Sequence, residues 1–101
     1  MIKHVVFFKL AAFAESNTKE ENALYLKREL ENLKVVVPGL LKMEVYINMP
    51  DVAADNYDLV LMAEFKNLQD LDVYINHPEH VKVASFMSKV RTDRAAIDYE
   101  F

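Results

Sequence analysis

The sequence predicts a single α+β domain with the element order β-α-β-β-α-β. Three features predict this order. Four segments alternate apolar and polar residues, a long apolar stripe with helical spacing separates the first two, and a proline-split helical stretch separates the last two. A chain of 101 residues is the size of one domain. A composition of 52% hydrophobic and 28% charged residues is typical of a folded protein rather than a disordered one.

The first strand is predicted for Ile2 to Leu10, where β-branched and aromatic residues are frequent. A simple connection is expected at Ala11 to Ser16. Both faces of this strand carry apolar side chains, so alternation alone does not say which one is buried. One face holds Ile2, His4, Val6, Phe8 and Leu10, and the other holds Lys3, Val5, Phe7 and Lys9.

The first helix is predicted to begin at a capping box, formed either by Asn17 with Glu20 or by Thr18 with Glu21. Pro38 cannot continue the helix, because it lacks a backbone N–H and disfavours helical geometry in the residue before it. Between these signals, apolar residues recur at three- and four-residue steps and define one stripe: Ala23, Leu26, Leu30, Leu33 and Val37.

The second and third strands are predicted for Leu40 to Asn48 and for Tyr57 to Phe65, where the alternation returns. The residues between them, Met49 to Asn56, include a proline and two aspartates and are expected to form a loop.

A short helix is predicted for Asn67 to Asn76, with Asn67 as its cap. His77-Pro78 breaks this helix, and Pro78 suits the first turn of a second one. Arg91 to Arg94 is expected to be a polar turn, and Ala95 to Phe101 alternates as the final strand. Asp98 and Glu100 share a face of that strand, where we expect them to be solvated or paired with nearby arginines.

This order of elements is the split βαβ pattern of ferredoxin-like folds, a four-stranded antiparallel sheet with helices on one face. Either choice of buried face leaves an apolar set of side chains on the other. The exposed set is either Val5, Phe7, Val60 and Met62, or Val6, Phe8, Leu59 and Leu61. Because exposed apolar sheet faces usually mark interfaces, we predict a homodimer that packs sheet against sheet as an α+β barrel.

Composition excludes several classes of function. A net charge of −4 gives no electrostatic support for binding nucleic acid. The absence of cysteine excludes disulfides, thiolate nucleophiles and cysteine-based metal clusters. No segment is long and apolar enough for a membrane span or an export signal, so we expect a cytoplasmic location and no membrane partner.

The segment from Tyr74 to His80 concentrates the proton chemistry of the chain. It holds Tyr74, His77 and His80, and the only other histidine is His4 on the first strand. Histidine titrates nearest to neutrality, and a tyrosine hydroxyl can polarise a carbonyl. The alternative is structural, with His77 capping a helix and the others packing. A site of three imidazoles for a metal is disfavoured by Pro78 and by the spacing, so no metal is predicted.

Four motifs in order make the chain resemble the stress-responsive dimeric A/B barrel (Dabb) domain family. They are Met1-Ile2-Lys3-His4-Val5-Val6-Phe7-Phe8-Lys9-Leu10, Val37-Pro38-Gly39, Tyr74-Ile75-Asn76-His77-Pro78-Glu79-His80 and Ile97-Asp98-Tyr99-Glu100-Phe101. The resemblance implies a ferredoxin-like dimer but no single activity. Many members are small stress-associated proteins, and a plant branch comprises polyketide cyclases that work without metal or cofactor.

By resemblance to that branch, Tyr74 would polarise or protonate a carbonyl and His80 would act as the general base. His4 and His77 would be ligand-binding neighbours. We therefore expect a cofactor-free protein that binds a small, mainly apolar or keto ligand, with possible aldol chemistry. The alternatives are a non-enzymatic stress-associated dimer and a cofactor-free monooxygenase-like enzyme.

Overall fold

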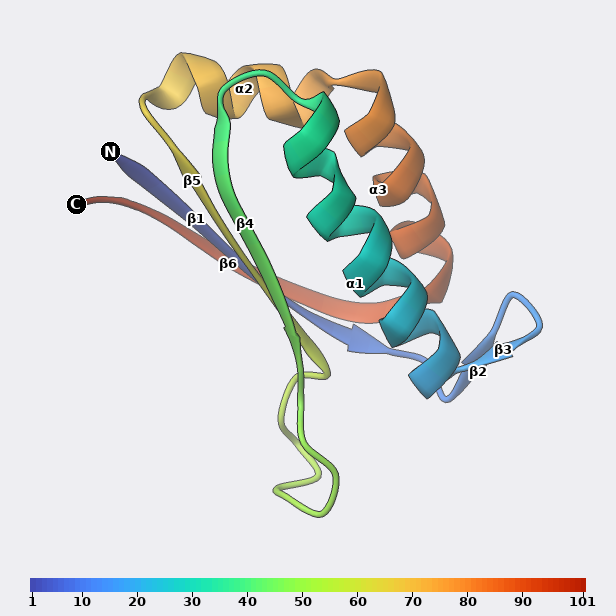
Figure 1. Cartoon of the computed structure of the whole chain (residues 1–101). Helices are drawn as coiled ribbons and strands as arrows, with labels where there is room; N and C mark the ends of the chain where they lie inside the picture. The colour runs from blue at the N-terminus through green and yellow to red at the C-terminus, as the bar shows by residue number, and fades with distance from the viewer.

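The structure, a computed structural model that describes residues 1–101, has all three helices on one face of a four-stranded antiparallel sheet (Figure 1). The strand order in the sheet is β4-β5-β1-β6, and a small hairpin of β2 and β3 lies outside it. This arrangement confirms the predicted ferredoxin-like fold. The element bounds are β1 Ile2–Leu10, β2 Phe13–Ala14, β3 Asn17–Thr18, α1 Lys19–Val36, β4 Leu40–Ile47, β5 Leu59–Phe65, α2 Leu68–Asn76, α3 Pro78–Val90 and β6 Arg91–Glu100.

Strand β1 lies inside the sheet, between β5 and β6, and shows which face is buried. Side chains at alternate positions point to opposite faces. Ile2, Val6, Phe8 and Leu10 are buried, whereas Phe7 on the opposite face is 37% exposed. The helices therefore cover the face that carries the even-numbered residues of β1, which decides between the two alternatives that the sequence left open.

Helix α1 begins at the second of the two predicted capping boxes. The backbone N–H of Glu21 donates to Thr18 Oγ1 at 3.2 Å, and the N–H of Thr18 donates to Glu21 Oε1 at 2.9 Å. The predicted apolar stripe is buried against the sheet. None of the helices has both the length and the apolar character that crossing a membrane requires.

Gly39 forms the turn from α1 into β4 with a φ of +82°, in the left-handed region that favours glycine. A Cβ atom at this position would lie 2.9 Å from Cγ of Asp70 on α2. Both the backbone conformation and the close approach of α2 therefore require a residue without a side chain here.

A hairpin occupies part of the segment that we expected to be a simple connection. Strands β2 and β3 pair through Ala14 and Asn17, and the two turn residues, Glu15 and Ser16, have φ values of 50° and 64°. Two successive positive φ angles are the geometry of a type I′ turn, which usually contains asparagine or glycine. Because neither residue type is present here, the turn could not be predicted from the sequence.

The prediction of a polar turn at Arg91 to Arg94 is wrong, because β6 already begins at Arg91. Arg94 pairs with Phe8 of β1, and Arg91 pairs with Leu10. Strand β6 is an edge strand and is exposed along most of its length. Polar side chains are tolerated on such an edge, so the apolar alternation that marks a buried strand is missing.

The sheet face turned away from the helices, called the open face below, is largely apolar. Phe7, Tyr46, Ile97 and Tyr99 are exposed on it, and Val60 and Met62 are partly buried. Two ion pairs lie on it, between Lys3 Nζ and Glu64 Oε2 at 2.8 Å and between Lys42 Nζ and Glu44 Oε1 at 3.5 Å. An apolar surface of this kind is typical of a protein interface.

Replacement of Leu26 by alanine tests the packing of α1. This side chain is fully buried between α1 and the sheet, so we expect the variant to lose about 2–5 kcal/mol of unfolding free energy through lost contacts and a residual cavity. Urea denaturation followed by circular dichroism measures the loss. Leu24→Ala is the matched control, because Leu24 is 63% exposed on the same helix and should change stability by less than about 0.5 kcal/mol. Equal losses in the two variants would contradict the described orientation of α1.

Candidate functional site

A cavity of about 220 Å³ lies between the sheet and the helices, on the buried face of the sheet. Aliphatic and aromatic side chains form most of its wall, and the polar groups come from β1, α2, α3 and β6. The lining residues are His4, Val6, Phe8, Leu30, Leu61, Tyr74, His80, Val83, Ala84, Met87, Arg91 and Arg94. Three of the four sequence-predicted site residues thus meet at one cavity, and the fourth, His77, does not line it.

Tyr74 is a buried side chain near the end of α2, with only 1% of its surface exposed. Its ring packs against Phe65 and lies 4.3 Å from the His80 ring, measured between centroids. Its hydroxyl has no hydrogen-bond partner in the chain. Burial raises the pKa of Tyr74 well above its ordinary value, so the hydroxyl keeps its proton. A buried hydroxyl of this kind is a donor without an acceptor.

The break between α2 and α3 places His77 and His80. In a continuous helix the N–H of Glu79 would bond to the carbonyl of Ile75. Instead this N–H donates to Nδ1 of His77 at 3.1 Å, and the Ile75 carbonyl accepts a hydrogen bond from Nδ1 of His80 at 2.9 Å. Pro78 occupies the first position of α3, where its missing N–H is harmless. The two histidines therefore supply partners for the backbone groups of Glu79 and Ile75, which the break between the helices separates.

His77 is the N-cap of α3 in this structure. A cap of this kind satisfies one of the free N–H groups at a helix start. This position matches the structural alternative that the sequence left open for His77. No group of three histidine, aspartate or glutamate side chains that could hold a metal ion comes together anywhere in the chain.

The hydrogen bond to Ile75 fixes the tautomer of His80. A carbonyl oxygen only accepts, so Nδ1 carries the proton and Nε2 is left with a free lone pair. Burial lowers the pKa of His80; the hydrogen bond to the Ile75 carbonyl offsets part of this effect, and the positive charge of Arg94 adds to it. The imidazole is therefore mainly neutral at pH 7, the state in which Nε2 accepts a proton.

His4 is buried on β1 and pairs with an acidic residue that sequence reasoning did not assign to the site. Its Nδ1 hydrogen-bonds to Oδ1 of Asp98, which lies directly opposite on β6. Its ring lies edge-on to Tyr74, with 6.2 Å between centroids. A carboxylate on Nδ1 orients an imidazole and favours the tautomer with a free Nε2. We had expected Asp98 to be solvated or paired with arginine, and only the register of β6 against β1 shows its partner.

Arg91 and Arg94 are two further residues of the site that the sequence does not indicate, because a polar turn is predicted for their segment. Both side chains line the cavity from β6, and neither forms an ion pair within the chain. The residues that line the cavity thus carry an unpartnered hydroxyl, two imidazoles and two guanidinium groups. Such a set can donate a proton to a carbonyl oxygen, accept one from carbon and bind negative charge.

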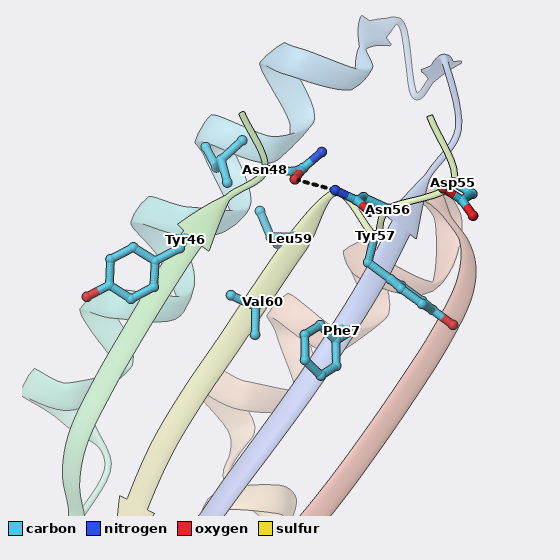
Figure 2. A pocket seen from close by; sticks show the side chains of 9 residues that line it. Phe7, Tyr46, Asn48, Asp55, Asn56, Tyr57, Leu59 and Val60 are labelled. Carbon is cyan, nitrogen blue, oxygen red and sulfur yellow. Dashed lines mark hydrogen bonds between the residues drawn. The ribbon is translucent and has the colours of Figure 1, made fainter. Parts of the chain in front are cut away.

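A second hollow, of about 440 Å³, lies on the open face and includes Phe7, Tyr46, Tyr57 and Val60. Figure 2 shows Tyr46, Val60 and Phe7 side by side on three neighbouring strands, below the loop that carries Asn48 and Asn56. The Tyr57 hydroxyl already donates to Asp93 at 3.0 Å. Although larger, this hollow contains no histidine and belongs to an exposed apolar surface, so the smaller cavity on the helix side is the candidate site.

Comparison with known proteins agrees with this fold. The family model of the stress responsive A/B barrel domain (Dabb) matches residues 2–101. The chain is 29% identical over 99 residues to the stress-response A/B barrel domain-containing protein DABB1 of Arabidopsis thaliana. That alignment covers 98% of this chain and 46% of the plant protein, so the chain spans less than half of that relative's length.

Two solved structures are similar over nearly the whole chain. A dimeric protein of ferredoxin-like fold from Bacteroides fragilis is 33% identical, with a TM-score of 0.83 over 99% of this chain and 95% of its own. Hydroxynitrile lyase from Passiflora edulis has a TM-score of 0.77 over 97% of this chain and 90% of its own, but at 14% identity it shows likeness of fold alone. Together with the match to the family model along residues 2–101, these results show that the chain belongs to the stress-responsive A/B barrel domain (Dabb) family.

Proposed function

We propose that this protein binds a small, mainly apolar keto compound in the cavity on the helix side and acts on it by acid–base chemistry without a cofactor. The observation that carries this proposal is the buried, unpartnered hydroxyl of Tyr74, a residue that lines the same cavity as His80. An unsatisfied buried donor costs about 1–3 kcal/mol. A ligand whose carbonyl oxygen accepts this hydrogen bond removes the cost.

The cavity volume of about 220 Å³ limits the ligand. An apolar cavity of about 150 Å³ holds benzene, and pockets for drug-sized molecules are about 300–1,000 Å³. The site therefore suits a molecule of one ring, or an open chain of similar size. This volume is too small for a long linear polyketide with an acyl tail, so we favour a short diketone.

An intramolecular aldol closure uses the two groups as follows. Nε2 of His80 removes a proton from a carbon next to one carbonyl of the diketone, and the resulting enolate attacks the carbon of the other carbonyl. The oxygen of that carbonyl becomes an alkoxide, which the Tyr74 hydroxyl stabilises and protonates. The imidazolium of His80 then returns its proton to Tyr74, so no proton is gained or lost overall. The closure also benefits from a cavity that holds the substrate folded.

We propose that His4, held by Asp98, has a positioning role. We propose that His77 does not contact the ligand. His4 lies edge-on to the Tyr74 ring and is held by a carboxylate, which supports a role in fixing that ring or in binding a second carbonyl. The side chain of His77 is engaged in capping α3.

We also propose that two copies associate through the open face. The apolar side chains there support this association, as does the dimeric state of the Bacteroides fragilis relative. A non-enzymatic dimer, acting through assembly alone, requires the open face but gives the cavity no role. The unpartnered Tyr74 hydroxyl therefore favours the enzyme over this alternative.

Variants of Tyr74 and His80 test the chemistry. We expect Tyr74→Phe and His80→Ala each to reduce turnover of short 1,5- and 1,6-diketones by about 10²–10⁴-fold, because each loses a proton donor or acceptor. Product formation is followed by chromatography. Tyr25→Phe is the matched control and should keep full activity, because Tyr25 packs against Phe86 away from the cavity. Unchanged turnover in both site variants would refute the assigned roles.

The pH dependence of the reaction gives a second test. The base must be neutral, and burial lowers the pKa of His80 below its ordinary value of 6.5. We therefore expect kcat/KM to rise with pH, with a midpoint below 6.5, and to stay level through neutrality because Tyr74 keeps its proton. NMR titration of the His80 ring protons should give the same midpoint. A midpoint above 6.5 contradicts His80 as the buried base.

The quaternary structure is tested by size-exclusion chromatography with light scattering at micromolar concentration. We expect a dimer, and a monomer for Phe7→Glu combined with Ile97→Glu, because two carboxylates would have to be buried in the apolar interface. Leu24→Glu, on the exposed side of α1, is the control and should remain dimeric. A monomeric parent protein with native circular dichroism rules out this interface.

A further inference from the structure

We infer that the ligand is a small carboxylic acid, whose carboxylate binds Arg91 and Arg94 while its apolar or keto part lies against Tyr74 and His80. This inference deepens the proposed function and depends on it only in taking the cavity as a ligand site. It starts from the charges at the cavity. The chain as a whole has a net charge of −4, yet the lining residues include two arginines and no acidic residue.

An irregularity in β6 brings the two arginines together. Residues three apart on a regular strand point to opposite faces. Here Phe8 pairs with Arg94, Lys9 with Asp93 and Leu10 with Arg91, so the register shifts and Thr92 is the extra residue of a β-bulge. The bulge returns Arg91 to the helix side of the sheet, and both arginines line the cavity.

The two guanidinium groups are free to bind a ligand. Both residues are exposed, and neither forms an ion pair with any carboxylate of the chain. Asp98, on the same strand, is bound to His4, and Asp93, next to Arg94, accepts a hydrogen bond from Tyr57. Guanidinium groups bind carboxylates through paired, charge-assisted hydrogen bonds. The arginines therefore form the charged part of the site.

The other lining residues supply the complementary part. Tyr74 offers a hydroxyl to a neutral oxygen, and Val6, Leu61, Val83 and Met87 give an apolar wall. A molecule that carries both a carboxylate and a ring or keto group matches both sets of lining groups within about 220 Å³. Free inorganic phosphate would satisfy the arginines but would leave the apolar wall and the Tyr74 hydroxyl without partners.

The test measures binding of acids against their neutral amides by NMR titration of the full-length ¹⁵N-labelled protein at pH 7. The pairs are benzoate with benzamide, phenylacetate with phenylacetamide, and 3-oxobutanoate with 3-oxobutanamide. We expect each acid that binds to have an affinity at least about tenfold higher than that of its amide. This preference should disappear in Arg91→Gln and in Arg94→Gln. Arg28→Gln, on the exposed side of α1 and outside the cavity, makes the same change in charge and should keep the preference.

Two results would overturn the inference. One is that no acid of the panel binds more tightly than its amide, or that Arg28→Gln weakens the acids as much as Arg94→Gln does. The other is that inorganic phosphate binds as tightly as the acids and displaces them, which would make the arginines a general anion site. Melting curves of each variant confirm that the fold is kept.

The Tyr74→Phe variant separates this inference from the proposed reaction. If it loses turnover but keeps the preference for acids, both proposals stand. A preference for acids in a protein that turns over no diketone or keto acid supports the inference and counts against the reaction. Turnover of neutral diketones without any preference for acids supports the reaction and refutes the inference.

Discussion

Burial of one face of the sheet beneath α1 and α3 is the interaction on which the rest of the structure depends. β1 contributes every second side chain to that layer, and His4 is one of them. The candidate site is therefore an incompletely filled part of the core and not a separate cleft. Two buried polar atoms in the chain have no hydrogen-bond partner, and one of them, the Tyr74 hydroxyl, belongs to a residue that lines this gap. The layer of side chains between the sheet and the helices therefore both stabilises the fold and contains the candidate reactive groups.

The two faces of the sheet differ in the side chains that they present, although both are largely apolar. On the helix side, histidine, tyrosine and arginine interrupt the apolar wall and enclose a small volume. On the open face, Tyr46, Val60 and Phe7 form a broad surface without titratable histidines (Figure 2). A one-layer sheet of this size leaves much apolar surface exposed, which association of two copies would cover.

Most of the fold could be predicted from local signals in the sequence. The alternation of Ile2–Leu10, the capping box of Thr18 with Glu21 and the break at Pro78 all depend on neighbours within a few residues, and each is where the sequence indicated. The failures involve distant partners. Asp98 reaches His4 only because β6 pairs with β1 in one particular register.

The arginines of β6 and the hairpin were hidden for related reasons. A bulge cannot be read from the spacing of Arg91 and Arg94, and the edge position of β6 removes the apolar pattern that would have marked it as a strand. The hairpin turns through Glu15 and Ser16, residues that seldom adopt positive φ. In the second helical segment the sequence pointed to Tyr74 and His80 correctly as neighbours, but their burial depends on how α2 and α3 pack against the sheet.

The bond between His80 and the Ile75 carbonyl has a consequence for how such a site changes over evolutionary time. The proton-accepting nitrogen owes its orientation to the main chain, which every amino acid supplies, and not to a second side chain that a single mutation could remove. Neighbouring positions are therefore free to vary and to reshape the cavity for new molecules, while the imidazole stays aligned. The proline that interrupts the helix thus keeps the His80 imidazole in a fixed orientation, while substitutions around it change which ligands the cavity accepts.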